Sequence, residues 1–466
     1  MKVKYIQIIC GLLLVLRFFL LQFIPLLDHT ESRYGEVARL MAETNNYAVP
    51  QIDYGVDFWA KPPLSTWLSA IGVEIFGETE FAVRLSSFIL GILILLICFK
   101  GFQFSKKQRW ILIALILTIP EFYLHLGVVS TDMSLLLAVT LVIVSFYNIM
   151  FYESHKIWGY LFFVGLGLGM LAKGPIIFIL TMPAIVVWWF FSKTKFIEIK
   201  KFPLVLGSIL TILIALPWYI IAEKQSPGFI DYFIIGEHFQ RFFNPDWVGD
   251  KYGEPHVQPF AIIWVFFVAF FLPYSILFIL KLVKQFRTIF ENKETLFLLT
   301  MIIWPLFFFT FSTSLIHTYT LPVVVPFAVL LVKLLPDLKI IKTYFKVSLI
   351  LPITAVIGIL VFTFKPELKD TFRTEKYLVE HINHQNIPIY HFYLKTFSGQ
   401  FYTKGKLKKI VADDIDVLIN KSKSGKEFYL IITKYDREAY PQIFSDKNFE
   451  ELNSNRKKLL FHFNKN

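Results

Sequence analysis

Charged side chains are scarce in this 466-residue chain: Asp, Glu, Lys and Arg together make up 18% of it, and hydrophobic residues make up 55%. A soluble domain usually carries about a quarter charged residues and at most about half apolar ones. The apolar excess is gathered in runs long enough to cross a bilayer, which takes about 20 helical residues. Segments such as 111–126 and 204–221 carry no polar stripe at helical spacing, which argues against a soluble protein with buried helices. The composition therefore predicts a polytopic membrane protein.

Cysteine is almost absent, since only Cys10 and Cys98 occur and both lie inside apolar runs, so no disulfide scaffold is implied. There is no glycine-rich phosphate loop, no internal repeat and no low-complexity stretch. The first 27 residues also lack a small-residue cleavage site, although Lys2 and Lys4 precede an apolar run. Because that run is long and includes Arg17, we predict an uncleaved first span instead of a signal peptide.

Basic residues exceed acidic ones by 47 to 35, giving a formal net charge of +12. They alternate with the apolar spans instead of forming one basic face, so nucleic acid is not an expected partner. With the N-terminus in the cytoplasm, every cytoplasmic connection carries Lys or Arg, as the positive-inside rule requires. The sequence predicts eleven spans, near 5–27, 81–100, 110–127, 133–151, 157–172, 175–192, 203–222, 259–280, 295–312, 318–335 and 345–364.

Three long segments are expected outside the bilayer on the far side from the cytoplasm: loops near 28–80 and 223–258, and the tail 366–466. Connections this long are uncommon without a function. In the tail, 387–394 and 428–433 have the composition of strands, and 413–423 that of a helix ending before Gly425. We expect a membrane domain over 1–365 and a small periplasmic α/β domain over 366–466.

The first long loop opens with a charged segment, Leu27 to Arg39. Thr30 is expected to cap a helix, with Glu31 favourable in its first turn. At helical spacing the apolar and charged positions separate, so the helix is amphipathic and suited to the membrane interface; the alternative is a packing element that caps the bundle. The apolar face comprises Tyr34, Val37, Ala38 and Met41, and the charged face comprises Arg33, Glu36 and Glu43.

Further ionisable groups fall at predicted helix ends on the same side of the bilayer: Lys61 before two prolines, Asp132, Lys173 and Arg241. Singly, each fits a snorkelling lysine or a charge near a helix dipole. Together they indicate a site, because ionisable groups at membrane depth tend to mark one. The chemistry that fits is transfer from a lipid-phosphate donor. The cations would neutralise the leaving phosphate, and a carboxylate would take a proton from the acceptor.

The motifs resemble the aminoarabinose (lipid A) transferase group of GT-C polyprenyl-phosphate-sugar glycosyltransferases, which are related to the protein O-mannosyltransferases. The resemblance spans roughly residues 10–325 and implies an all-α polytopic bundle with periplasmic loops. It implies a bacterial inner-membrane location as well. The matching pieces are TESRYGE at 30–36, KPP at 61–63, TD at 131–132, KG at 173–174, LPW at 216–218, EHFQRF at 237–242 and HTYTLP at 317–322.

The resemblance implies an undecaprenyl-phosphate-linked sugar as donor. Lys61, Arg241 and Lys173 would bind its phosphate, and Arg33, Tyr34, His238 and Tyr319 would shape the site. One departure concerns the first loop, where the family typically has an Asp-Glu pair and this chain has Thr30 before Glu31. The catalytic carboxylate is then expected to be Glu31, Asp132 or Asp28. Alternatively, an acceptor that is already ionised, such as a lipid A phosphate, needs no strong base.

We therefore expect a glycosyltransferase that acts on lipid A or a related envelope glycolipid at the periplasmic face. Protein O-glycosylation from the same donor class, a transporter of a lipid-linked substrate and a catalytically inactive relative are the alternatives. A transporter is disfavoured because repeats and polar groups near the bilayer midplane are not evident. The sequence indicates no cofactor with certainty, and a divalent metal ion stays an open alternative.

Overall fold

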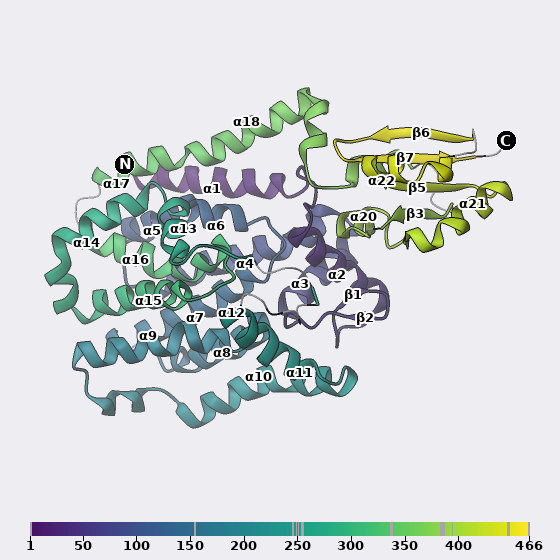
Figure 1. Cartoon of the computed structure of the whole chain (residues 1–466). Helices are drawn as coiled ribbons and strands as arrows, with labels where there is room; N and C mark the ends of the chain where they lie inside the picture. Colours follow the sequence, from purple (N-terminus) through teal and green to yellow (C-terminus); the bar gives the residue numbers. More distant parts are fainter. Residues whose placement is uncertain are drawn as a thin grey trace.

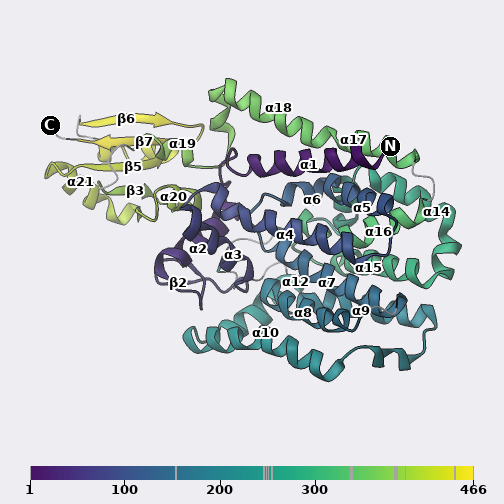
Figure 2. The same cartoon turned by 180° about the vertical axis from the view of Figure 1, so that it is seen from behind.

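A computed structural model gives the fold of the chain as a long helical bundle with a small sheet domain at one end (Figure 1). The C-terminal strands lie at the same end of the bundle as α2, β1 and β2, a relationship that the opposite view also displays (Figure 2). We call this end of the bundle the site end. The structure describes residues 2–152, 155–244, 247, 249, 251–252, 256–335, 339–382, 387–393, 395–444 and 448–464.

The bundle is built from the apolar runs of the sequence. Its helices are α1 (Val3–Leu20), α4 (Glu80–Gly101), α5 (Lys106–Thr118), α6 (Pro120–His125), α7 (Asp132–Phe151), α8 (Ile157–Lys173), α9 (Ile176–Ser192), α10 (Leu204–Gln225), α13 (Ile262–Phe270), α14 (Tyr274–Glu291), α15 (Lys293–Thr310), α16 (Val324–Leu334), α17 (Lys339–Ser348) and α18 (Ile350–Phe364).

Each of the eleven predicted spans is largely helical in the structure. Among the described residues, seven helical stretches are long and apolar enough to cross a membrane, and α13 with α14, bent by 110°, makes an eighth candidate. The remaining three predicted spans coincide with shorter helices: α5 continued by α6, then α8, then α9. Pro120 breaks the first of these because proline is tolerated at the start of a helix and not in its interior.

Helix α7 lies at the centre of the bundle, with its residues from Asp132 to Ile149 all buried. The outer helices instead expose large apolar side chains, among them Phe190 on α9, Val205 on α10 and Phe364 on α18, each at least 74% exposed. A soluble monomer rarely exposes apolar surface on this scale. This pattern suits helices that face lipid, and the chain is a multi-pass membrane protein.

Segments between the long helices build the site end. They are α2 (Thr30–Thr44), β1 (Gln51–Asp53), β2 (Val56–Asp57), α3 (Leu64–Phe76), α11 (Phe229–Asp231), the π-helical η2 (Tyr232–Gln240), α12 (Arg241–Phe243) and the 3₁₀ helix η3 (His317–Val323). The predicted amphipathic helix is α2, and its apolar face is buried as expected.

Two details of the α2 prediction are wrong. His29 occupies the N-cap position and Thr30 is the first helical residue, without a side-chain capping bond. Glu36, assigned to the charged face, is fully buried. It is stable there because Arg39, one turn later and also fully buried, lies 2.8 Å from its carboxylate, and buried charges require such a partner.

The tail forms a five-stranded sheet in the order β4-β3-β5-β7-β6. β3 pairs with β4 and β5 in parallel, whereas β7 pairs antiparallel with β5 and β6. The two predicted strands are β3 and β5, and the predicted helix is α21. The elements are β3 (Ile389–Phe392), β4 (Leu407–Ile410), β5 (Phe428–Thr433), β6 (Phe449–Ser454), β7 (Lys458–Phe463), α19 (Lys376–Val379), α20 (Phe397–Tyr402), α21 (Ile415–Lys423) and α22 (Lys434–Ala439).

The sheet domain packs on the first loop through polar contacts. Asp28 accepts a hydrogen bond from the Ser398 backbone N–H at 2.9 Å. Lys395 forms an ion pair of 2.7 Å with Asp53. The Tyr402 hydroxyl accepts a bond of 2.7 Å from a backbone N–H that immediately precedes the loop. These contacts fix α2, whose first residues line the cavity described next.

Candidate functional site

A cavity of about 310 Å³ opens at the site end of the bundle. Helix α2 and the segment around Lys61 line one side, and the start of α7 and the end of α8 line another. Helices α9, η2, α12, α15 and η3 and the segment 312–316 also contribute to the wall. The polar side chains of the lining are Thr30, Arg33, Tyr34, Lys61, Thr131, Asp132, Lys173, Glu237, His238, Arg241, Tyr252, His256, Ser312, Ser314, Thr318 and Tyr319.

Positive charge is in excess in this cavity. Among the described lining residues, four carry a cationic side chain, and two, Asp132 and Glu237, carry a carboxylate. The difference is two positive charges when the histidines are neutral. A cleft lined by one sign of charge concentrates ligands of the other sign, so the cavity is suited to an anion.

Glu237 joins two of the cations. Its carboxylate lies 2.7 Å from the Lys61 ammonium and 3.2 Å from the Arg241 guanidinium. Burial alone would raise the pKa of the Glu237 carboxyl, but the charges of Lys61 and Arg241 outweigh burial and hold this pKa below its ordinary value. Glu237 is therefore ionised and holds both cations beside the cavity.

Lys173 and Asp132 form the second ion pair, with 2.6 Å between Nζ and Oδ1. The Lys173 ammonium also lies 4.7 Å from the centre of the Tyr319 ring, which is a cation–π distance. The chain turns sharply after Lys173 at Gly174, whose φ is +80°. A Cβ at Gly174 would meet the Phe233 ring at 2.6 Å, so glycine permits both the turn and the close packing of η2.

Arg33 projects from α2 into the same cavity. Its Nη1 donates to the Tyr252 carbonyl, and its guanidinium lies 5.5 Å from the Tyr34 ring centre and 5.8 Å from that of Phe58. Its Nε is buried and has no hydrogen-bond partner in the part of the chain that the structure describes. A buried donor without a partner is costly.

His238 is a neutral member of the lining. Burial lowers the pKa of its imidazole below the ordinary value, because charging a buried ring costs solvation. Its Nδ1 lies 2.7 Å from the Phe233 carbonyl and its Nε2 lies 3.4 Å from the Lys173 carbonyl. A neutral imidazole donates from one nitrogen only, so His238 bonds the Phe233 carbonyl within η2 through Nδ1 and lies beside the end of α8 without adding charge to the cavity.

Known proteins resemble this chain in both sequence and fold. Residues 10–233 match the family of dolichyl-phosphate-mannose-protein mannosyltransferases. The undecaprenyl phosphate-alpha-4-amino-4-deoxy-L-arabinose arabinosyl transferase of Aeromonas hydrophila is 31% identical over 66% of this chain and 55% of its own length. The same-named protein of Aeromonas salmonicida is 31% identical over 69% of this chain and 59% of its own length. The chain resembles the aminoarabinose transferases.

Solved structures extend the likeness to the fold. The crystal structure of ArnT from Cupriavidus metallidurans bound to undecaprenyl phosphate superposes with a TM-score of 0.80, at 16% identity, over 99% of this chain and 98% of that one. The apo structure of the same protein gives 0.78. The predicted fold class is therefore confirmed. In sequence, the matched region covers less than two thirds of the curated aminoarabinose transferases.

Eight of the ten predicted site residues line the cavity: Arg33, Tyr34, Lys61, Asp132, Lys173, His238, Arg241 and Tyr319. Thr30, at the position where the resemblance to the aminoarabinose transferases places an aspartate, lines it as well. Segments up to 289 residues apart in the sequence thus converge on one cavity.

The other two, Asp28 and Glu31, do not line the cavity. Both Glu31 carboxylate oxygens accept bonds from Arg84, at 2.7 and 2.8 Å. Asp28 accepts from the Ser32 hydroxyl at 2.6 Å and from Ser398. The contacts of Glu31 thus join α2 to α4, and those of Asp28 join α2 to the sheet domain, so neither carboxylate faces the site.

Among the polar lining residues without a role predicted from the sequence are Glu237, Tyr252 and His256. Glu237 precedes Arg241 by four residues, a spacing at which opposite charges on a helix interact, so that ion pair was accessible from the sequence. Tyr252 and His256 lie in the predicted loop 223–258, where no periodicity distinguishes a lining residue from a solvated one.

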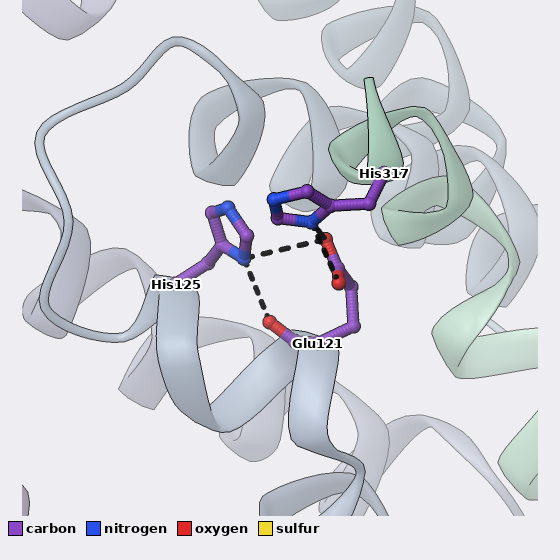
Figure 3. A group of neighbouring side chains, drawn as sticks. All are labelled: Glu121, His125 and His317. Carbon is purple, nitrogen blue, oxygen red and sulfur yellow. Dashed lines mark hydrogen bonds and ion pairs between the residues drawn. The ribbon is translucent and has the colours of Figure 1, made fainter. Parts of the chain in front are cut away.

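A further group lies close to the cavity without lining it. Glu121, His125 and His317 bring one carboxylate oxygen and two imidazole nitrogens within 4.8 Å of one another (Figure 3). Within the described ranges this is the one cluster of His, Cys, Asp and Glu side chains with the spacing of a metal site. The sequence analysis assigned no metal ligands.

Proposed function

We propose that the chain is a glycosyltransferase that moves a sugar from an undecaprenyl-phosphate-linked donor to lipid A or a related envelope glycolipid. The observation that carries the proposal is the cationic cavity, which Lys61, Arg241 and Lys173 line together with Arg33. The names of the relatives and the undecaprenyl phosphate bound to the solved ArnT structure support this choice of donor.

In this proposal, Lys61 and Arg241 bind the phosphate of the donor. Glu237 holds both cations in place before the donor arrives, so little reorganisation accompanies the reaction. The bond between the anomeric carbon and the phosphate oxygen breaks, and undecaprenyl phosphate leaves with the electron pair. Preorganised cations stabilise the negative charge that grows on the leaving group, and the Arg33 guanidinium in the cavity wall adds positive charge.

The acceptor in this proposal is an anionic phosphate oxygen. Asp132 and Glu237, the two carboxylates among the described lining residues, each pair with a lysine. A carboxylate engaged in this way is a poor base for a hydroxyl group, because proton uptake would break the ion pair. An ionised phosphate attacks the anomeric carbon without giving up a proton, so no base is needed, and Asp132 serves to orient Lys173.

The proposal also includes a location. The chain would lie in the bacterial inner membrane with its N-terminus in the cytoplasm and the cavity on the periplasmic face. Residues 1–365 would form the membrane domain and 366–466 the periplasmic domain. The lysines and arginines of the expected cytoplasmic connections support this orientation. Reporter fusions after Gln103 and after Asn464 test it: only the second should report a periplasmic position.

The experiment that tests the activity is a comparison of envelope lipids. Lipid A from wild-type cells and from a deletion strain is analysed by mass spectrometry, and the deletion is complemented with wild-type or Arg241→Met protein. We expect a sugar-sized mass that is absent from the deletion strain and restored only by the wild-type protein. Unchanged lipid A in all strains, with the protein expressed, would contradict the proposal.

One observation favours a second acceptor class. The family matched by residues 10–233 is named for protein mannosyltransferases, and a protein acceptor offers a Ser or Thr hydroxyl. Such an acceptor needs a base, for which Asp132 is the candidate after release from Lys173. Glycoprotein profiles of the same strains distinguish the two classes. Sugar transfer by purified protein in detergent, without any gradient, would distinguish a transferase with either acceptor from a transporter.

A further inference from the structure

Glu121, His125 and His317 form a compact group of side chains (Figure 3). Glu121 lies in the first turn of α6 and His125 ends that helix, four residues later, on the same face. His317 begins η3, 192 residues further along the chain. The Glu121 and His125 side chains are buried, and the His317 side chain is 38% exposed.

The polar atoms of the group converge on the Glu121 carboxylate. His317 Nδ1 lies 3.0 and 3.1 Å from the two carboxylate oxygens. His125 Nδ1 lies 2.8 Å from the Glu121 main-chain carbonyl and 3.5 Å from the carboxylate. The Phe270 ring stacks on the His317 imidazole, with centres 4.3 Å apart and an 8° angle between the planes, and this stacking restricts the orientation of His317.

We propose that this group binds a divalent zinc ion. Two imidazoles and one carboxylate are a common zinc ligand set, with metal–ligand distances of about 2.0–2.2 Å and a fourth position left for water. Tetrahedral geometry then separates ligand atoms by about 3.4 Å, so atoms now within 4.8 Å need only small side-chain rotations. Zinc binding would replace the bond between His125 Nδ1 and the Glu121 main-chain carbonyl, because Nδ1 is the ring nitrogen that lies 3.5 Å from the Glu121 carboxylate.

The proposed ion would fasten η3 to α6. Helix η3 carries Tyr319, two residues after His317, and the Tyr319 ring contacts the Lys173 ammonium in the cavity. None of the three ligands lines that cavity. The ion would therefore position one wall of the site and would not contact the substrate. This inference does not depend on the proposed transferase activity, because metal binding is measured without substrate.

The test is the zinc content of the full-length protein, purified in detergent with an affinity tag that contains no histidine. The protein is treated with a chelator, reloaded with zinc chloride, desalted and analysed by inductively coupled plasma mass spectrometry. We expect about one zinc ion per chain. His317→Gln and His125→Gln should each lower this content at least fivefold. His462→Gln should leave it unchanged, because His462 lies in the sheet domain, where it pairs with Glu427 at 2.8 Å.

A cobalt-loaded sample supplies a second readout. Co²⁺ in a tetrahedral site should give a visible absorption band in wild type and in His462→Gln, and no band in His317→Gln. Because Glu121 is buried and its variants are prone to misfold, the half-exposed His317 is the decisive position, with circular dichroism and gel filtration confirming its fold. Wild-type protein without zinc, or a folded His317→Gln variant that keeps its zinc, would overturn the proposal.

Discussion

Replacing Lys61 with methionine removes one of the two cations that Glu237 holds beside the cavity. Methionine keeps most of the side-chain volume, so packing changes little while the charge is lost. If Lys61 binds the donor phosphate, the variant should bind undecaprenyl phosphate more weakly. The effect should lie mainly in affinity for this phosphate ligand and not in the fold, because the buried Glu237 carboxylate keeps Arg241 as its partner in the variant.

The magnitude follows from the charges at the site. Two unit charges 4 Å apart interact by about 4 kcal/mol at an effective dielectric constant of about 20. Glu237, 2.7 Å from the Lys61 ammonium, offsets part of the attraction between this ammonium and the phosphate. Arg241 remains in the variant and still attracts the phosphate. A hydrogen bond to a charged group contributes about 1.5–3 kcal/mol net, which corresponds to a roughly 10- to 150-fold weaker Kd. The upper half of that range is expected, because Glu237 loses a neutralising partner and repels the phosphate.

The assay is a titration of purified protein in detergent with undecaprenyl phosphate. Lys251→Met is the matched control, because Lys251 lies against the Trp59 ring, 3.9 Å from its centre, and does not line the cavity. Its Kd should stay within twofold of wild type. Raising the salt concentration should weaken phosphate binding more in wild type than in Lys61→Met, because salt screens the Lys61 charge, which only the wild type carries. Equal Kd values for wild type and Lys61→Met, or an equal loss in the control, would refute the assignment of Lys61.

Three further predictions concern single carboxylates or their partners. Glu237→Gln should weaken undecaprenyl phosphate binding about tenfold, because Lys61 and Arg241 lose the carboxylate that holds them beside the cavity; tighter binding in the same titration would mean that Glu237 acts chiefly as a repulsive charge. Arg84→Met should destabilise the protein by about 3–5 kcal/mol, read as a lower melting temperature, because Glu31 loses both of its 2.7–2.8 Å bonds; an unchanged melting temperature would contradict this. Burial would raise the pKa of Glu375, but His391 and Lys458 outweigh it and lower the pKa to about 2. The ionised Glu375 carboxylate thus contributes at most about 3 kcal/mol to the free energy of unfolding. This contribution is present above pH 4.5 and is lost as the pH falls towards 2. Hydrogen exchange in the sheet should show this loss in wild type and not in Glu375→Gln.

The bundle and the sheet domain were predictable because local patterns determine them. Runs of apolar residues must become helices in lipid, and the two runs of the tail that are rich in Ile, Tyr and Phe have the composition of strands; they form β3 and β5. The cationic lining was also predictable, although Lys61, Lys173 and Arg241 are far apart in the sequence. The topology places the ends of alternate spans on one side of the membrane, so ionisable residues at those ends are brought together.

Tertiary partners could not be predicted in the same way. Glu31 appeared to be a catalytic candidate because its partner, Arg84, lies 53 residues later inside an apolar run. Nothing in that run indicates which helix Arg84 faces. Glu121 and His125 have helical i,i+4 spacing, but His317 joins them only through the packing of η3 on α6. Side-chain pairs of this kind depend on the crossing of helices, which the periodicity of one segment does not specify.

The threonine at position 30 is consistent with the charge of the cavity. The lining has an excess of two positive charges among the described residues. A donor phosphodiester contributes one negative charge and an acceptor phosphate at least one more, so the loaded site is close to neutral. An aspartate at position 30 would lower the excess to one and supply a base, which suits an uncharged hydroxyl acceptor. Thr30 neither lowers the positive excess nor supplies a base. Because an unbalanced charge in a partly buried site is costly, the cavity favours an acceptor that carries its own negative charge.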